Sequence, residues 1–369
     1  MAVAALTLRD LNRATLARQM LLRRERGTVA AVVSRLVAMQ AQLARPPFVG
    51  LWTRTEGFRR ADLHAALVAR KLVRVTSLRG TLHLMTAADF VGLRGAIQPA
   101  LDKGLQSILK DRLETFDAAA VTAETRTFFG KAPATFDALR IHFKKKYPKG
   151  DERAMAYAMR LTLPLVQVPA DTAWSFPAAA DFALADEWLG KPVPTAIQPA
   201  ATLILRYLAA FGPATPADAQ TWSALGGLRE AFEALRPKLV TFRDERKHEL
   251  FDLPDAPRPS GDTPAPVRFL PEFDNLLLSH DDRTRVIADA HRSRVFSKNL
   301  QVKAAFLVDG LVAGTWKAER KKKAATLTIE PFAAVPKKIT GALEEEGDAL
   351  LQFLESDAES RNVIVKRPA

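Results

Sequence analysis

The sequence predicts an α+β protein of three tandem winged-helix modules, a form of the helix-turn-helix, followed by a C-terminal, mainly β, barrel-like unit. Three observations support this prediction. Helical apolar spacing followed by two short β-rich runs occurs three times in succession. A Pro-rich stretch, residues 253–266, separates these repeats from the rest of the chain. Beyond it, strand-forming runs predominate.

The length of the chain is consistent with several structural units. Its 369 residues exceed a typical single domain. Of these residues 48% are hydrophobic and 26% charged, which is the composition of an ordinary globular protein. We place the expected domain boundaries at residues 1–90, 91–192, 193–256 and 257–369.

The first module begins with two helices, expected over residues 8–22 and 28–39, and a third is expected over 61–70. Charged residues interrupt the first of these at helical spacing, so it is predicted to be an amphipathic helix of the fold and not a signal peptide. Two β-rich runs, "LVRVTSL" and "TLHLMT", then predict a hairpin that turns at Arg79-Gly80.

The second module has the same order of elements. Helices are expected over residues 122–129, 135–145 and 152–163. The runs "LVQV" and "AWSF", with Asp171-Thr172 near the turn, predict its hairpin.

The third module shows the pattern best. A helix over residues 201–211 leads into "GPATPADAQTWSALGG", where Thr215 is expected to cap a short helix. Gly226-Gly227 predicts a turn before a helix over 228–235, and "LVTFRDERKHELFDL" predicts a closing hairpin.

The C-terminal unit is predicted to be mainly β and to pack on the helical modules. Its strongest signal is Asp309-Gly310 within "QVKAAFLVDGLVAGTWKAE", a sequence typical of a tight hairpin. A strand in "AATLTIEPF", a helix over residues 337–356 and a last strand in "NVIVK" complete it.

The charge and the absence of cysteine narrow the function classes. The net charge of +13 indicates a polyanionic partner, nucleic acid first and an anionic membrane second, unless the protein is basic without such a partner. Zero cysteines exclude disulfides, thiolate zinc sites and a cysteine nucleophile, and fit a cytoplasmic protein. No apolar run approaches the roughly 18 residues needed to cross a bilayer.

Three segments resemble a known family. "RGTLHLMTAADF", "RFLPEFDNLLLSHDDR" and "FLVDGLVAGTWK" are similar, in that order, to segments of the winged-helix crosslink-repair DNA glycosylases, the YcaQ/AlkZ-like family. That family has a catalytic motif of Gln, a hydrophobic residue, and Gln or Asp in its first winged helix. Here the motif matches Gln40-Ala41-Gln42, the AlkZ-like variant. Ala41 is a small residue at the hydrophobic position, a mild departure from the family pattern.

The resemblance implies a monofunctional enzyme that hydrolyses the N-glycosidic bond of alkylated purines in duplex DNA. N7-alkylguanine is the main implied lesion, and interstrand crosslinks are included for some members. The implied role is base excision repair or self-resistance to a DNA-alkylating natural product. Neither a metal nor a cofactor is implied, and we expect a monomer.

Neutral glutamines are compatible with this chemistry. Alkylation at N7 makes guanine cationic, so the base departs without a strong general acid, and water attacks C1′ from the opposite face of the sugar. An amide can both accept and donate hydrogen bonds, and so can fix that water. Modest electrostatic stabilisation would complete the mechanism. Without the family segments, two polar residues at a helix end would be the simpler interpretation.

The motif requires a particular backbone conformation. In a continued helix, Gln40 and Gln42 would point about 200° apart and could not share a water molecule. In an extended segment, the period of two places both side chains on one face and Ala41 on the other. We therefore predict that the chain becomes extended near Met39.

The first hairpin supplies further candidates for contact with the lesion. Arg74, Thr76, Thr81 and His83 alternate with apolar residues, which predicts one polar face and one core face. Arg79 at the turn, Thr81 and His83 could approach a phosphate or the damaged nucleotide. A structural role for His83, and a merely solvated Arg79, stay open as alternatives.

Three basic clusters are candidate phosphate contacts, although each could be a solvated face. Their members are Lys144, Lys145 and Lys146; Arg243, Arg246 and Lys247; and Arg320, Lys321, Lys322 and Lys323.

Other functions are less well supported. Acidic residues and a histidine in "LPEFDNLLLSHDD" match no standard metal-ligand spacing and are interpreted as loop and cap residues. A non-enzymatic winged-helix DNA-binding protein, either a transcription regulator or a drug-sequestering resistance protein, is the alternative function. Such regulators usually dimerise on palindromes, which three unequal modules do not favour. No aromatic RNA-binding motif supports an RNA partner.

Overall fold

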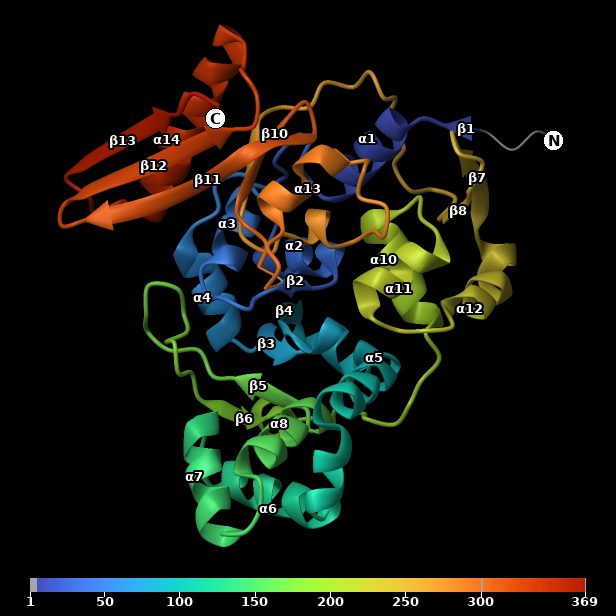
Figure 1. The fold of residues 1–369 in the computed structure, drawn as a ribbon, viewed down its shortest axis with the longest axis vertical. Coiled ribbons are helices and arrows are strands. Elements are labelled where there is room, and N and C mark those ends of the chain that lie inside the picture. Colours follow the sequence, from blue (N-terminus) through green and yellow to red (C-terminus); the bar gives the residue numbers. More distant parts are fainter. Residues whose placement is uncertain (1–4, 300, 369) are drawn as a thin grey trace.

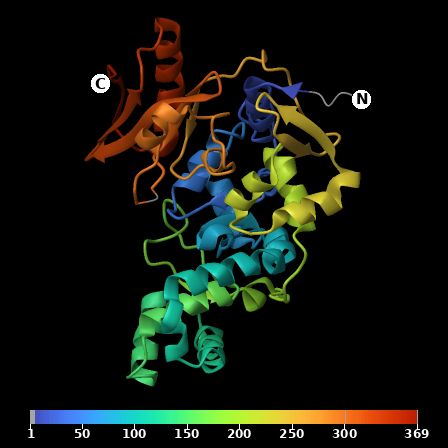
Figure 2. The same ribbon diagram turned by 45° about the vertical axis from the view of Figure 1, so that its right-hand side comes forward.

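The computed structural model describes residues 5–299 and 301–368 and confirms the predicted α+β class. The strands of these residues form three sheets. In both Figure 1 and Figure 2, the teal and green helices of residues 118–162 and the red C-terminal strands lie at opposite ends of the molecule. The segment that contains Gln40 lies between these two ends.

A five-stranded sheet occupies the centre. Its order is β2-β4-β3-β5-β6. The strands are β2 (Met39–Gln40), β3 (Leu72–Thr76), β4 (Leu82–Thr86), β5 (Leu165–Gln167) and β6 (Phe182–Leu184). Because β3 pairs with β5, this sheet extends across the expected boundary between the first and second modules. The four-domain division stays a prediction.

The predicted helices of the first module are present, and one more accompanies them. They are α1 (Leu8–Arg18), α2 (Val29–Leu36), α3 (Pro46–Trp52) and α4 (Arg60–Val68). Helix α3 was not predicted. Pro46 and Pro47 lie in its first turn, where a main-chain N–H has no partner within the helix, so the missing N–H of a proline costs no hydrogen bond.

The second module contains a long helix that the sequence analysis did not predict, α5 (Ala87–Leu109). The other helices here are α6 (Ala118–Lys131), α7 (Phe136–Lys146), α8 (Glu152–Thr162) and α9 (Ala185–Leu189). The prediction of a strand in "AWSF" is wrong. Ser175 has a left-handed φ of 62°, and Phe176 packs into the core of the first module, so β5 pairs with β6 instead.

The third module has the expected elements. They are α10 (Ala201–Phe211), α11 (Pro216–Ser223), α12 (Leu228–Leu235), β7 (Val240–Asp244) and β8 (Glu249–Asp252). Thr215 caps α11 as predicted, in a capping box with Asp218. An N-terminal strand, β1 (Ala5–Leu6), joins this hairpin in parallel with β7.

The expected barrel-like C-terminal unit is an open sheet in the described residues. Its order is β13-β12-β11-β10-β9. The elements are β9 (Arg268–Leu270), α13 (Asp289–Val295), β10 (Ala305–Val308), β11 (Leu311–Lys321), β12 (Ala324–Pro331), α14 (Lys337–Leu354) and β13 (Ser360–Val365). Helix α14 shares a core with this sheet, so apolar residues are buried against a helix instead of inside a closed barrel.

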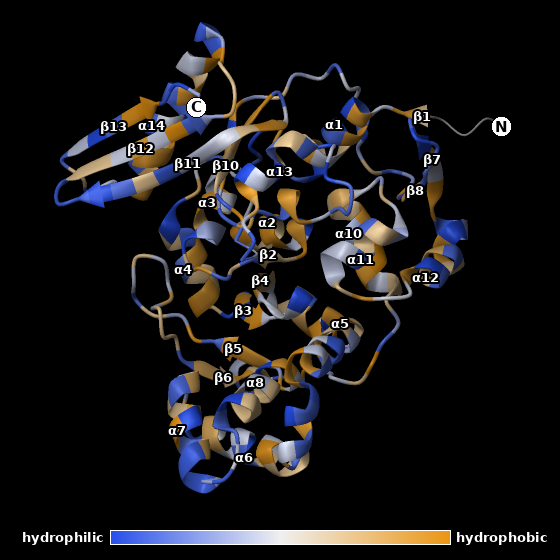
Figure 3. Cartoon of the chain, in the orientation of Figure 1, coloured by the Kyte–Doolittle hydropathy of each residue, from blue (hydrophilic) through white to orange (hydrophobic). Residues whose placement is uncertain are grey.

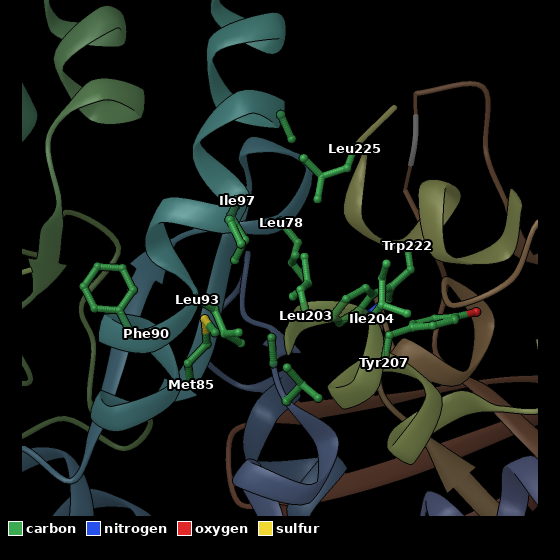
Figure 4. Close-up of a cluster of buried hydrophobic side chains, with 14 of the residues drawn as sticks. Leu78, Met85, Phe90, Leu93, Ile97, Leu203, Ile204, Tyr207, Trp222 and Leu225 are labelled. Carbon is green, nitrogen blue, oxygen red and sulfur yellow. The ribbon is translucent and has the colours of Figure 1, made fainter. Parts of the chain in front are cut away.

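The turn after β3 is fixed by a hydrophobic cluster. Figure 4 shows Leu78 between Ile97 of α5 and Leu203 of α10, with Trp222 of α11 beside them. All four side chains are buried. This packing holds the short 3₁₀ turn η1 (Leu78–Gly80) against the third module, and so determines where Arg79 lies.

No helix of residues 5–299 and 301–368 has the length and apolar character needed to span a bilayer.

Candidate active site

The chain leaves helix α2 and becomes extended at the glutamine motif, as predicted. Val37 has a φ of 67°, a conformation that a β-branched residue rarely adopts. Met39 and Gln40 then pair with Leu84 and His83 of β4. One residue later, the Ala41 main-chain N–H donates to the carbonyl of Leu82 over 2.7 Å.

The amide of Gln40 is held by Arg79. Nη2 of Arg79 donates to Oε1 of Gln40 over 2.7 Å. A guanidinium only donates hydrogen bonds, so the oxygen of the Gln40 amide, and not its NH₂ group, faces Arg79. The Gln40 side chain is 9% exposed, and its Nε2 donates to no protein group among the described residues.

The amide of Gln42 meets the same turn. Its Oε1 accepts from the main-chain N–H of Leu82 over 3.3 Å, in place of a ladder hydrogen bond to the strand. The residue is exposed. Both glutamine side chains therefore reach toward residues 79–82, the convergence that an extended backbone predicts.

Arg79 bridges two parts of the fold. Its left-handed backbone, with φ of 55°, lies in the η1 turn, and its Nη1 donates to the carbonyl of Trp222. Burial lowers the pKa of Arg79 to about 10, and repulsion from Arg283 adds to the shift. The guanidinium stays protonated at neutral pH and orients Gln40.

His83 lies beneath the surface beside Gln40. It has no exposed surface, its Nδ1 lies 3.0 Å from the carbonyl of Thr81, and its buried Nε2 has no partner among the described residues. Because a carbonyl only accepts, the proton lies on Nδ1. Burial, followed by the charge of Arg79, lowers the pKa of His83 to about 3. His83 is therefore neutral at pH 7.

This environment predicts that His83 does not titrate between pH 5 and 8. Its folded pKa lies below the unfolded value of about 6.5, so it contributes stability above pH 6.5 that is lost as pH falls toward 3. We expect ring resonances in ¹H–¹⁵N spectra to keep the neutral tautomer pattern throughout this range. A midpoint near pH 6.5 for His83 would contradict the buried placement.

The expectation of one polar face on the first hairpin is wrong. Residues opposite each other in a sheet share a face, and the register pairs Val75 with His83 and Thr76 with Leu82. His83 therefore lies on the face of Val75, and Arg74 and Thr76 lie on the other. Thr81 is half-buried and donates from Oγ1 to the carbonyl of Leu78 over 3.2 Å.

Residues 271–275, which are distant from the motif in the sequence, contact the chain just before and just after it. Nδ2 of Asn275 donates to the carbonyl of Ala38, just before the motif. Glu272 accepts from Arg45, just after it, over 2.7 Å. Sequence reasoning missed this contribution, because more than two hundred residues separate the partners.

A small cavity adjoins Gln40. Its volume of about 10 Å³ is close to the space of a single water molecule. Three buried polar atoms of its lining residues lack a partner among the described residues: Oε1 of Gln19, Nε of Arg54 and Oε2 of Glu272. Donors and acceptors of this kind are what an ordered water requires.

The acidic residues of "LPEFDNLLLSHDD" have separate protein partners. Asp274 caps a 3₁₀ turn and pairs with Arg54, and Asp282 pairs with Arg246. His280 lies between Ser279 and the carbonyl of Phe211. These are structural roles. Among the described residues, no group of three or more His, Asp or Glu side chains is arranged to hold a metal ion.

The three basic clusters are exposed but are not adjacent. Figure 1 and Figure 3 show them at the end of α7, at the β7–β8 turn and at the β11–β12 turn, which lie at separate edges of the molecule. Carboxylates partly neutralise each of them. Among the described residues, the ion pairs are Lys146 with Glu124, Arg246 with Asp282, Arg320 with Glu355 and Asp357, and Lys323 with Glu359.

Comparison with known proteins gives one family and one fold. A family model described as "DNA glycosylase AlkZ-like" matches residues 33–353. The solved structure of Streptomyces sahachiroi DNA glycosylase AlkZ is similar with a TM-score of 0.78 and 20% sequence identity, over 98% of this chain and 100% of that chain. At that identity, the similarity demonstrates a shared fold. No curated protein matches the chain.

Proposed function

This chain belongs to the AlkZ-like DNA glycosylase family, and we propose that it excises alkylated purines, N7-alkylguanine above all, from duplex DNA. Gln40 and Gln42 are the proposed catalytic residues. In the reaction, the oxygen of water bonds to C1′ and the bond from C1′ to N9 breaks. Its electron pair neutralises the cationic base, and the water proton passes to solvent. The products are the free base and an abasic site.

The observation that carries the proposal is the arrangement of the two amides. Each Oε1 keeps a second lone pair beyond its contact with Arg79 or with the Leu82 N–H, so each amide can still accept from a water molecule. The water-sized cavity beside Gln40 supports a water close to the motif. Prearranged groups of this kind avoid the cost of ordering them during the reaction.

The charge state of the neighbouring histidine is compatible with a cationic substrate. An imidazolium beside a developing oxocarbenium ion would oppose it electrostatically. His83 is neutral at pH 7 and adds no such repulsion. Since the base leaves as a neutral molecule, no strong acid is required, and a protonated histidine would bring no benefit.

The proposed partner is double-stranded DNA with alkylated bases, bound by a monomer in the cytoplasm. The basic clusters at the end of α7, the β7–β8 turn and the β11–β12 turn are the proposed distant phosphate contacts. Each phosphate they neutralise should steepen the salt dependence of affinity by about 0.9 in the log–log slope. Large adducts need an open site, and the exposure of Gln42 supports one.

The test is a set of duplexes with N7-alkylguanine lesions from methyl to bulky adducts, incubated with excess protein. We expect release of the free modified base and an alkali-sensitive abasic site from at least the smallest lesion. If no lesion in the set releases a base, while the protein still binds the duplex, the proposed substrate class is wrong.

A further inference from the structure

Two buried arginines of the fold, Arg18 and Arg54, have carboxylate partners. Arg18 and Asp252 pair over 2.7 Å with side chains 1% and 0% exposed, and Arg54 and Asp274 pair in the same way. A buried charge without a counter-charge is costly, because desolvation is not offset. Arg74, beside the glutamine motif, lacks such a partner among the described residues, as do Arg94 and Arg285.

Arg74 is buried, with 5% exposure, and has no carboxylate within ion-pair distance among the described residues. Its Nε donates to the carbonyl of Ala41 over 2.9 Å, and its Nη2 donates to the carbonyl of Gln42 over 3.2 Å. Its guanidinium stacks 4.8 Å from the ring of Phe176. Nη1 donates to no protein group in the described part of the chain.

Arg160 of α8 brings a second positive charge to the same place. Its Nε lies 3.4 Å from Oγ1 of Thr76, which is two residues from Arg74 and therefore on the same face of β3. Arg160 also forms no ion pair with a described carboxylate. Burial lowers the pKa of Arg74 to about 10, and repulsion from Arg160 adds to that shift.

Gln167 completes the polar group. It lies directly opposite Arg74 in the sheet, is 8% exposed, and its buried Oε1 has no partner among the described residues. Since neither end of the amide has a protein partner, the amide can turn its NH₂ group toward an anion. Two guanidinium groups and one amide thus offer donors beside the main chain of Gln42.

We propose that Arg74 and Arg160 form a binding site for one backbone phosphate of the damaged strand, next to the nucleotide whose base is released. This inference rests on the proposed function and identifies how the strand is held at that same site. Bidentate phosphate binding is what arginine favours.

The substrate gives a second reason for a phosphate. Unneutralised guanidinium groups beside a cationic base would oppose the developing positive charge on the sugar. A phosphate between Arg74 and Arg160 removes that opposition. The contacts of Arg74 with the carbonyls of Ala41 and Gln42 would then link the position of the strand to that of Gln42.

The test combines a protein variant with a neutralised phosphate. Binding is measured to a duplex that contains a tetrahydrofuran abasic analogue, so no catalysis is involved. Methylphosphonate replaces, one at a time, the three phosphates on each side of the analogue in that strand. Arg160→Gln is the variant, because Arg74 also supports the motif through two main-chain contacts.

For the wild type, we expect roughly tenfold weaker binding when one particular phosphate is neutralised. For Arg160→Gln, the same replacement should change affinity less than about twofold, and the salt slope should fall by about 0.9. If the losses of affinity caused by Arg160→Gln and by methylphosphonate replacement are additive at all six phosphates, the proposed phosphate site is wrong. A free-anion site would likewise give additivity, because no backbone phosphate would be involved.

Arg229 of α12 provides the matched control. It is exposed, is not part of the proposed site of Arg74 and Arg160, and lines a hollow of about 850 Å³ together with Glu233 and Glu249. Arg229→Gln removes the same charge, and neutralising the particular phosphate should still weaken its binding about as much as it weakens binding of the wild type. If Arg229→Gln also became insensitive to neutralisation of that phosphate, the assignment to Arg160 would be wrong. Base release by the wild type is scored separately, so a failure of the proposed function is recognised independently.

Discussion

Replacing Gln42 with alanine should lower the single-turnover rate of base release by about 100-fold, the size of effect expected when a positioned reactant loses its alignment. Gln40→Ala should have a comparable effect. In Gln42→Ala, the Leu82 N–H loses its acceptor and the attacking water loses one of its two amide partners. In Gln40→Ala, the guanidinium of Arg79 is left without the amide that it orients.

Two variants separate this chemistry from damage to the fold. Gln42→Glu keeps an acceptor for the Leu82 N–H and adds a negative charge that suits an oxocarbenium ion, so it should retain measurable release. Gln352→Ala removes an exposed glutamine on α14 and should leave the rate unchanged. Full excision by both alanine variants, with wild-type unfolding curves, would remove the glutamines from the mechanism.

The second large effect concerns stability. Asp274→Ala should lower the free energy of unfolding by about 3–5 kcal/mol, because Arg54 would be left as an unpaired buried charge. The two carboxylate oxygens of Asp274 lie 2.7 and 2.9 Å from Nη2 and Nη1 of Arg54. Asp274 also accepts from the main-chain N–H of Leu276. Urea-induced unfolding measures the change.

An acidic residue a few positions away provides the comparison. Asp282 pairs with Arg246, but the side chains are 50% and 64% exposed, so Asp282→Ala should cost less than about 1 kcal/mol. Equal destabilisation by the two substitutions would show that Asp274 has no special structural role. It would also weaken the view that residues 271–275 hold the glutamine motif.

Local sequence signals predicted much of the fold. The hairpin at Asp309-Gly310 is present as β10 and β11, and the capped helix after Thr215 is present as α11. The change from helix to extended backbone at Met39 followed from what the motif would need, and β2 confirms it. The resemblance predicted a DNA glycosylase, which the family match confirms.

The face on which His83 lies could not be obtained from alternation alone. Five residues lie between the paired Thr76 and Leu82. Because that number is odd, even-numbered residues of β3 lie opposite even-numbered residues of β4, and His83 therefore shares a face with Val75 instead of Arg74. A turn of one residue more or less would have reversed the faces. The sequence shows where the turn occurs, but not how many of its residues leave the ladder.

Contacts between distant segments were equally inaccessible. Arg79 contacts Gln40 and Trp222, and Asn275 holds Ala38, across separations of 39, 143 and 237 residues. The contacts of Arg79 arise because the first and third modules pack on one hydrophobic cluster, and Asn275 lies beside Leu276 and Leu277, which share another cluster with Leu16 of α1. No local pattern encodes that packing, so neither the orienting role of Arg79 nor the residues that hold the motif followed from spacing.

The central claim is that two neutral amides suffice because the damaged base is already cationic. It is tested most directly by comparing release of N7-methylguanine with that of 7-methyl-7-deazaguanine, an uncharged base of nearly the same shape, in the same duplex. The account predicts excision of the first and retention of the second, with similar binding of both duplexes. Equal rates of release from the two would contradict it.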